Sequence, residues 1–166
     1  SCTQVLRDSD LQFKSYPLDW LFGSDLKGRI DIVASKFQRF LEIQDLVYTY
    51  SERSISCDAY HNTYNDLTFN HDFLSQKSLN ETFPAVSEKY NRRIQRLLTT
   101  IDNSQTILGV YIDTPCSNSK KSTPQDLIRY RKKLNKIFPN KKFDLLYICP
   151  DNTLQHGQFK YTPLDG

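Results

Sequence analysis

Apolar residues recur at helical spacing in three segments of the chain, and each segment predicts an amphipathic helix. The clearest helix covers residues 83–101, and a second covers residues 26–43. A third covers residues 124–137 and follows Thr123-Pro124, a capping residue and a proline at the first helical position. The polar positions of the first helix carry charged side chains, namely Glu88, Lys89, Arg92, Arg93 and Arg96.

Short and nearly continuous apolar runs predict β-strands between and after these helices. The clearest are residues 106–112 and 143–149, which suit neighbouring strands covered on both faces. Residues 46–50 and 67–69 are weaker candidates. From residue 69 onward, strands and helices alternate. We therefore expect an α/β fold with a layered, mostly parallel central sheet, flanked by helices and joined by right-handed crossovers.

Sites in such folds gather where parallel strands end. The predicted strand ends lie near His71, Asp113 and the Pro150-Asp151 pair.

The composition is that of one soluble domain over residues 1–166. With 38% hydrophobic and 25% charged residues, the chain has enough apolar surface to exclude disorder as its main state. The longest apolar run, residues 107–112, is far shorter than the roughly 20 residues that a membrane helix needs. The first residues carry no secretory pattern, so we expect a cytoplasmic protein without a membrane span.

The charge and the cysteine spacing narrow the function further. A net charge of +3 is too small to indicate nucleic-acid binding. The four cysteines include no C-x-x-C pair, so we predict reduced thiols and no metal site. We expect no cofactor. The usual nucleotide-binding, zinc-protease and serine-hydrolase motifs are missing from the sequence.

The third predicted helix is surrounded by basic residues, which we interpret as a solvated face, with phosphate or polyanion binding as the alternative. They are Arg129, Arg131, Lys132, Lys133, Lys136, Lys141 and Lys142.

Three short segments carry candidate chemistry. Cys2 precedes a stretch that could open a helix, where the partial positive charge lowers a thiol pKa and favours the nucleophilic thiolate. His71 follows a short strand and could serve as the base for a thiol, whereas Asp72 would point to the opposite face of an extended chain. Asp19 lies between a proline and the only tryptophan, where a stiff loop could hold a carboxylate against an imidazole. Each segment alone is also compatible with an ordinary surface or turn residue.

Taken in order, these segments resemble a known bacterial family. The matching segments are Cys2 with Gln4-Val5-Leu6, Ser15-Tyr16-Pro17-Leu18-Asp19-Trp20, Phe69-Asn70-His71-Asp72-Phe73, Lys89-Tyr90-Asn91-Arg92-Arg93 and Phe143-Asp144-Leu145-Leu146-Tyr147. They are similar to the family described as putative papain-like cysteine peptidases, also classified as a domain of unknown function.

The resemblance implies a catalytic set of Cys2, His71, Asp19 and Asp72. Cys2 would be the nucleophile and His71 its base, acting on a carbonyl substrate. Family members usually have a strand and a small-residue turn before the cysteine, so we expect a native N-terminal strand that precedes Ser1.

Three hypotheses stay open at this point. The first is a cysteine-dependent hydrolase, or an acyltransferase or deacylase that acts on acyl or glycan substrates in bacterial surface polysaccharide biosynthesis. The second is a non-catalytic binding module. The third is a polyanion-binding protein that uses the basic third helix.

Overall fold

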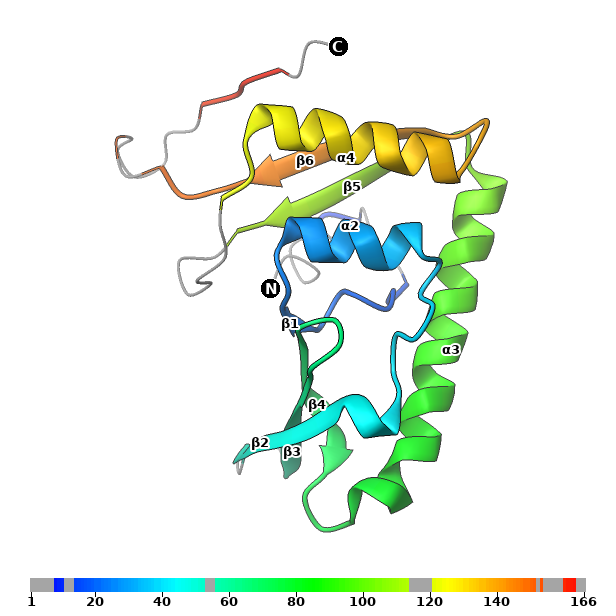
Figure 1. The fold of residues 1–166 in the computed structure, drawn as a ribbon, viewed down its shortest axis with the longest axis vertical. Helices are drawn as coiled ribbons and strands as arrows, with labels where there is room; N and C mark the ends of the chain where they lie inside the picture. Colours follow the sequence, from blue (N-terminus) through cyan, green and yellow to red (C-terminus); the bar gives the residue numbers. More distant parts are fainter. Residues whose placement is uncertain are drawn as a thin grey trace.

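The strands of this protein form two separate sheets that are linked by one long helix (Figure 1). The larger sheet has the order β1-β4-β3-β2, and all its neighbouring strands are antiparallel. The smaller sheet pairs β5 with β6 in parallel. The computed structural model describes residues 8–10, 14–52, 56–113, 121–151, 153 and 160–163.

The larger sheet is a run of hairpins to which a two-residue strand is added. A short 3-10 helix, Ile43–Asp45, leads directly into the second strand. The third strand was not predicted, because its sequence Cys-Asp-Ala-Tyr-His-Asn has no apolar run. The strands are β1 (Phe22–Gly23), β2 (Leu46–Glu52), β3 (Cys57–Asn62) and β4 (Leu67–Leu74).

The smaller sheet and its crossover helix confirm the local predictions. β5 (Thr106–Ile112) and β6 (Lys142–Ile148) lie side by side, connected through α4 (Pro124–Ile137). The helix begins with a capping box, in which the Thr123 hydroxyl accepts from the Asp126 backbone N–H and the Asp126 carboxylate accepts from Thr123.

The expected mostly parallel central sheet is wrong. The helix α3 (Leu79–Asn103) contains 25 residues, and at 1.5 Å per residue it is roughly 37 Å long. It therefore carries the chain from one sheet to the other, and β4 and β5 do not share a sheet (Figure 1). An alternating order of strands and helices does not tell which strands pair.

The smaller sheet is also not covered on both faces, as the sequence led us to expect. Among the described residues, one face of β5 and β6 packs against helices, while the other leaves large apolar side chains exposed. These are Leu108, Ile112, Leu146 and Ile148.

The helix α2 (Leu26–Ala34) ends nine residues before the predicted end at residue 43. The Phe37 N–H donates to the Ile32 carbonyl and the Lys36 N–H to the Val33 carbonyl, a pattern that closes a helix at a left-handed residue. That residue is Lys36, with φ +53°. Glycine is the usual choice at this position, so the sequence carried no signal for the stop.

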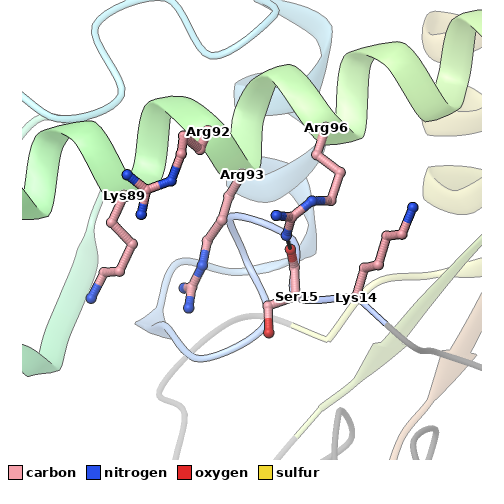
Figure 2. Close-up of a pocket in the computed structure, with 6 residues that line it drawn as sticks. All are labelled: Lys14, Ser15, Lys89, Arg92, Arg93 and Arg96. Carbon is pink, nitrogen blue, oxygen red and sulfur yellow. Dashed lines mark hydrogen bonds between the residues drawn. The ribbon is translucent and has the colours of Figure 1, made fainter.

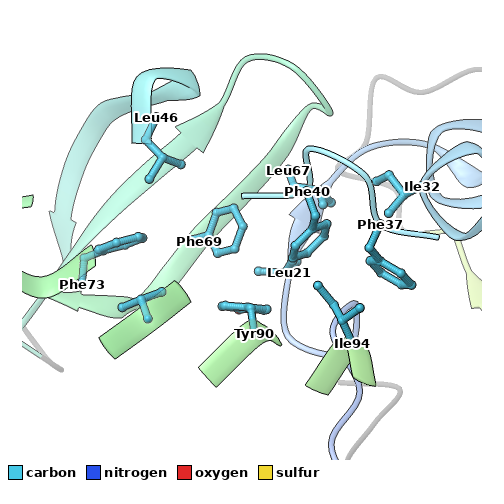
Figure 3. Close-up of a cluster of buried hydrophobic side chains, with 11 residues drawn as sticks. Leu21, Ile32, Phe37, Phe40, Leu46, Leu67, Phe69, Phe73, Tyr90 and Ile94 are labelled. Atoms are coloured by element: carbon cyan, nitrogen blue, oxygen red, sulfur yellow. The ribbon is translucent and has the colours of Figure 1, made fainter. Parts of the chain in front are cut away.

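Two clusters of buried side chains hold the elements together. The first packs β4 against α3, where the Phe69 and Tyr90 rings meet edge to face at 5.2 Å (Figure 3). The second lies between α2, α4, β6 and the end of α3, and includes Ile30, Ile101 and Leu134. Because α3 contributes to both clusters, it fixes the two sheets relative to each other.

Candidate functional site

The pairing of β4 with β3 is interrupted by a bulge, and the predicted His71-Asp72 pair lies in it. The register shifts there, so Ala59 is the single residue of β3 opposite residues 70–72 of β4. Bulges re-aim side chains and are common beside active sites. The His71 side chain is exposed. The Oδ1 atom of the preceding Asn70 is buried without a hydrogen-bond partner in the described part of the chain.

The Asp72 carboxylate is held by two side chains of α3. Lys89 Nζ donates to Oδ1, and the Tyr90 hydroxyl donates to Oδ2 at 2.9 Å. The side chain of Asp72 is only 9% exposed. Burial, together with the Asp72 charge, raises the pKa of the Tyr90 hydroxyl, which keeps it protonated as a donor. Asp72 and His71 therefore have different surroundings, and the bulge, not a regular alternation, leaves His71 exposed.

Asp19 closes a tight turn with Tyr16. The Tyr16 N–H donates to Asp19 Oδ2 at 2.7 Å, and the Asp19 N–H donates to the Tyr16 carbonyl at 3.4 Å. Pro17 is buried between them. The stiff loop predicted from the sequence is present, although Trp20 is half-buried and not one of the buried core residues.

The Arg29 side chain holds the rest of this loop against α2. Its guanidinium lies over the Tyr111 ring at 5.8 Å from the ring centre. No sequence pattern marked Arg29, because its partners are backbone atoms. They are the carbonyl oxygens of Leu18 at 3.1 Å, Leu21 at 2.8 Å, Gly23 at 3.0 Å and Ser24 at 3.3 Å.

A stack of aromatic rings connects this arginine to the end of the parallel strands. Tyr111 of β5 stacks on Tyr147 of β6, with ring centres 5.8 Å apart. The Tyr147 hydroxyl donates to Asp113 Oδ2 at 2.9 Å, and the Asp113 side chain is buried. Burial and this hydrogen bond raise the pKa of the Tyr147 hydroxyl. Asp113, which the sequence placed at the end of a strand, is thus hydrogen-bonded to a tyrosine of the neighbouring strand.

The other predicted strand-end segment makes local contacts only. The Pro150 carbonyl accepts from Lys121 Nζ at 3.1 Å, and Asp151 Oδ1 accepts from the Thr153 hydroxyl at 2.6 Å. These hydrogen bonds are exposed, and nothing in them indicates a reacting group.

A hollow of about 2010 Å³ lies between the 16–25 segment, α2 and β5. Its long wall extends from β4 to β6 and includes Asp19, Trp20 and His71, which the hollow by itself does not bring into contact. Cys2 lies outside the described residues.

The two described cysteines differ in exposure to solvent. Cys57 is buried, and burial raises the pKa of its thiol, with the Asp72 charge adding to the effect. Cys149 is exposed. Cys57 is therefore protected from reagents, whereas Cys149 is accessible to them.

Four of the seven basic residues around α4 lie within 4.0 Å of an acidic side chain, Lys142 at 3.7 Å from Asp144 among them. Lys133 contacts Asp31 at 2.7 Å, and Arg129 contacts Asp126 at 2.6 Å. Arg131 lies 3.9 Å from Asp144. These pairs favour the interpretation of α4 as a solvated face.

A comparison with protein-family models matches residues 1–148 to the family described as "Putative papain-like cysteine peptidase". The chain belongs to this family. Searches of the curated proteins and of the solved structures found no match.

The family match covers every predicted catalytic residue, from Cys2 to Asp72, and extends through β6. The described part of the chain contains no group of three or more His, Cys, Asp or Glu side chains that could hold a metal ion. Among those same residues, no helix has the length and apolar character to cross a membrane.

Sequence reasoning missed the residues that hold the candidate site together. Arg29, Lys89 and Tyr90 each contact a segment that carries a predicted catalytic residue. Lys89 and Tyr90 were part of the family resemblance, and that was the available signal, but their contacts join positions 17 and 18 residues apart.

Proposed function

We propose that this family member is a cysteine-dependent hydrolase in which Cys2 is the nucleophile and His71 its base. His71 takes the proton of the Cys2 thiol, and the thiolate attacks the substrate carbonyl to form a carbon–sulfur bond. The imidazolium then gives this proton to the leaving amine or alcohol as its bond to the carbonyl carbon breaks. Water, activated by His71, cleaves the resulting thioester, releasing a carboxylic acid and the free thiol.

The observation that carries this proposal is the family match, which covers Cys2, Asp19 and His71, and it is supported by the exposed place of His71 in the bulge of β4. The His71 side chain is exposed, so it is accessible to a thiol and to a substrate. A general base must come within about 3 Å of the atom that carries the proton it removes, here the Cys2 sulfur.

We assign the role of orienting His71 to Asp19. A carboxylate in this role holds the imidazole in one tautomer and stabilises its charged form. Asp19 Oδ2 is fixed by the Tyr16 N–H, which supports a rigid carboxylate. Asp72 is the second candidate, but its carboxylate would have to leave Lys89 and Tyr90 to reach the His71 ring.

The test is the rate at which iodoacetamide alkylates each cysteine at pH 7, measured by peptide mapping after brief exposure. Cys2 should react faster than the exposed Cys149, which is an internal reference thiol. His71→Ala should slow Cys2 by about tenfold, because the thiolate fraction falls toward that of an ordinary cysteine. Equal rates at Cys2 and Cys149 would contradict the proposal.

A matched control separates the role of His71 from a general effect of losing a histidine. His61 lies on the neighbouring strand β3, half-buried, where its ring contacts Thr68 at 3.3 Å. His61→Ala should leave the Cys2 alkylation rate unchanged. If both variants slow Cys2 equally, the effect comes from the sheet and His71 is not the base.

Hydrolysis and acyl transfer share the same thioester and differ in what attacks it. A chromogenic thioester or ester probe distinguishes them. With a hydrolase, the rate of probe turnover is independent of added amines or alcohols. A turnover that requires such an acceptor would show an acyltransferase with the same Cys2 and His71 chemistry.

A further inference from the structure

A groove of about 630 Å³ opens beside α3, and its described lining is almost entirely cationic. Figure 2 shows the side chains of α3 along one wall and those of residues 14 and 15 facing them. No carboxylate lines it among the described residues. The lining residues are Lys14, Ser15, Lys89, Arg92, Arg93 and Arg96.

Most of the α3 cations in the groove are partly committed to other contacts. Lys89 pairs with Asp72, and Arg92 pairs with the exposed Glu88 at 2.6 Å. Arg96 Nη1 donates to the Ser15 carbonyl at 2.8 Å. Among the described residues, two carboxylates thus offset the four α3 cations, which leaves positive charge in excess.

Arg93 is the exception, and it lies between the others (Figure 2). Its side chain is half-buried, and its guanidinium packs over the Tyr90 ring at 5.4 Å from the ring centre. The described residues offer it no hydrogen-bond acceptor. A guanidinium carries five N–H donors in a planar fork that matches phosphate and carboxylate oxygens. A half-buried fork without an acceptor, among other cations, is suited to an anion.

We infer that this groove binds the diphosphate group of a small molecule. Lys89, Arg93 and Arg96 follow one stripe of α3, which is roughly 10 Å long at 1.5 Å per residue. A single phosphate cannot span this stripe, whereas two linked phosphates can contact neighbouring cations. The volume of about 630 Å³ suits a small ligand. None of the described residues that line the groove is aromatic, which disfavours base stacking and so a single-stranded nucleic acid.

The inference is tested by calorimetric titration of the full chain with inorganic pyrophosphate. Arg92→Gln/Arg93→Gln should weaken pyrophosphate binding by about tenfold or more, because two charge-assisted donors are lost. Lys132→Gln/Lys136→Gln is the matched control, since it removes the same charge from exposed positions on α4. The control should bind as the unaltered chain does. Equal weakening in both variants would overturn the inference in favour of net charge alone.

Four further measurements test the chemistry of the ligand, with one variant and three competing ligands. Arg93→Lys keeps the charge and loses the fork, so it should still weaken binding by roughly threefold or more. Inorganic phosphate and citrate should each bind more weakly than pyrophosphate. If phosphate binds equally well, the diphosphate assignment is wrong, and if citrate or an oligothymidylate binds better, the site recognises carboxylates or nucleic acid instead.

Folding is monitored by circular dichroism for each variant, and Lys14→Gln repeats the test from the opposite wall of the groove. Lys14→Gln should also weaken pyrophosphate binding while leaving α3 unaltered. No detectable pyrophosphate binding at millimolar concentration to the folded, unaltered chain would overturn the inference. Because this readout is equilibrium binding, it does not depend on the proposed activity of Cys2.

Discussion

Replacing Arg29 with methionine tests how the loop that carries Asp19 is held. Methionine keeps much of the aliphatic packing but removes donors to four backbone carbonyls, between Leu18 and Ser24. Three of these bonds are partly buried, and the one to Gly23 is exposed. An unpaired buried carbonyl costs about 1–3 kcal/mol, and the low end applies where water can reach it.

Three partly buried carbonyls at the low end of this range give an expected loss of about 3 kcal/mol in the free energy of unfolding for Arg29→Met. The net loss is somewhat smaller, because methionine does not carry the free-energy cost of burying a charged guanidinium. Burial lowers the pKa of the Arg29 guanidinium, which is the expected sign of this cost of burying the charge. Arg29→Lys should recover less than half of the loss, because one ammonium cannot reach carbonyls spread along the loop.

Urea unfolding followed by circular dichroism measures both values, with Arg92→Met as the control. Arg92 is exposed and pairs only with Glu88, so its loss should cost at most about 1 kcal/mol. A loss below about 1 kcal/mol in Arg29→Met would refute the reasoning, because the loop would then hold its shape without the guanidinium.

Three other predictions follow from individual contacts. Gly23→Ala should destabilise the protein by about 2 kcal/mol or more in urea unfolding, because Gly23 has φ +74° and an added Cβ would lie 2.4 Å from the Asp66 carbonyl oxygen. Gly109→Ala should be milder, since the added Cβ comes close only to the flexible end of the Leu145 side chain, at 3.0 Å, and lies at an ordinary 3.8 Å from the Asp144 carbonyl oxygen. Hydrogen bonds from Ser78 lower the pKa of the Glu81 carboxyl in the folded protein. These hydrogen bonds therefore stabilise the fold fully at pH values above the ordinary glutamate pKa of about 4.3. Their stabilisation is lost as the pH falls through the lower pKa of the folded state. Glu81→Gln should therefore flatten the fall in unfolding free energy between about pH 5 and pH 3, and an unchanged slope would contradict this. Asp72→Asn should cost about 1–2 kcal/mol in thermal unfolding, because Lys89 loses its partner while Tyr90 keeps an acceptor.

The elements that sequence predicted well are those set by local signals. The start of α4 is encoded in Thr123-Pro124 and the capping box with Asp126, all within four residues. β5 and β6 are apolar runs bounded by polar residues. The end of α2 was missed because Lys36 takes a left-handed conformation that its residue type does not announce.

Strand pairing was predicted poorly because it depends on contacts between distant residues. β4 has the same local character whether its neighbour is β5 or β3, and the polar sequence of β3 gave no reason to choose it. The contacts of the candidate site were also hard to predict, because they too join residues that are distant in the sequence. Regular alternation along β4 would place His71 on the same face as the buried Phe69 and Phe73, but the bulge leaves it exposed. The partners of Asp72 come from α3, on the far side of a turn.

The helix α3 connects the candidate site to the basic groove. Its buried face packs against β4 through Tyr90, while Lys89 and Arg96 reach the segments that carry Asp72 and Ser15. Those two cations therefore contribute to structure as well as to the charge of the groove. Arg93 has only the Tyr90 ring as a partner among the described residues. Arg96→Gln should thus weaken folding and anion binding together, whereas Arg93→Gln should weaken mainly anion binding, and this difference separates a binding residue from a structural one.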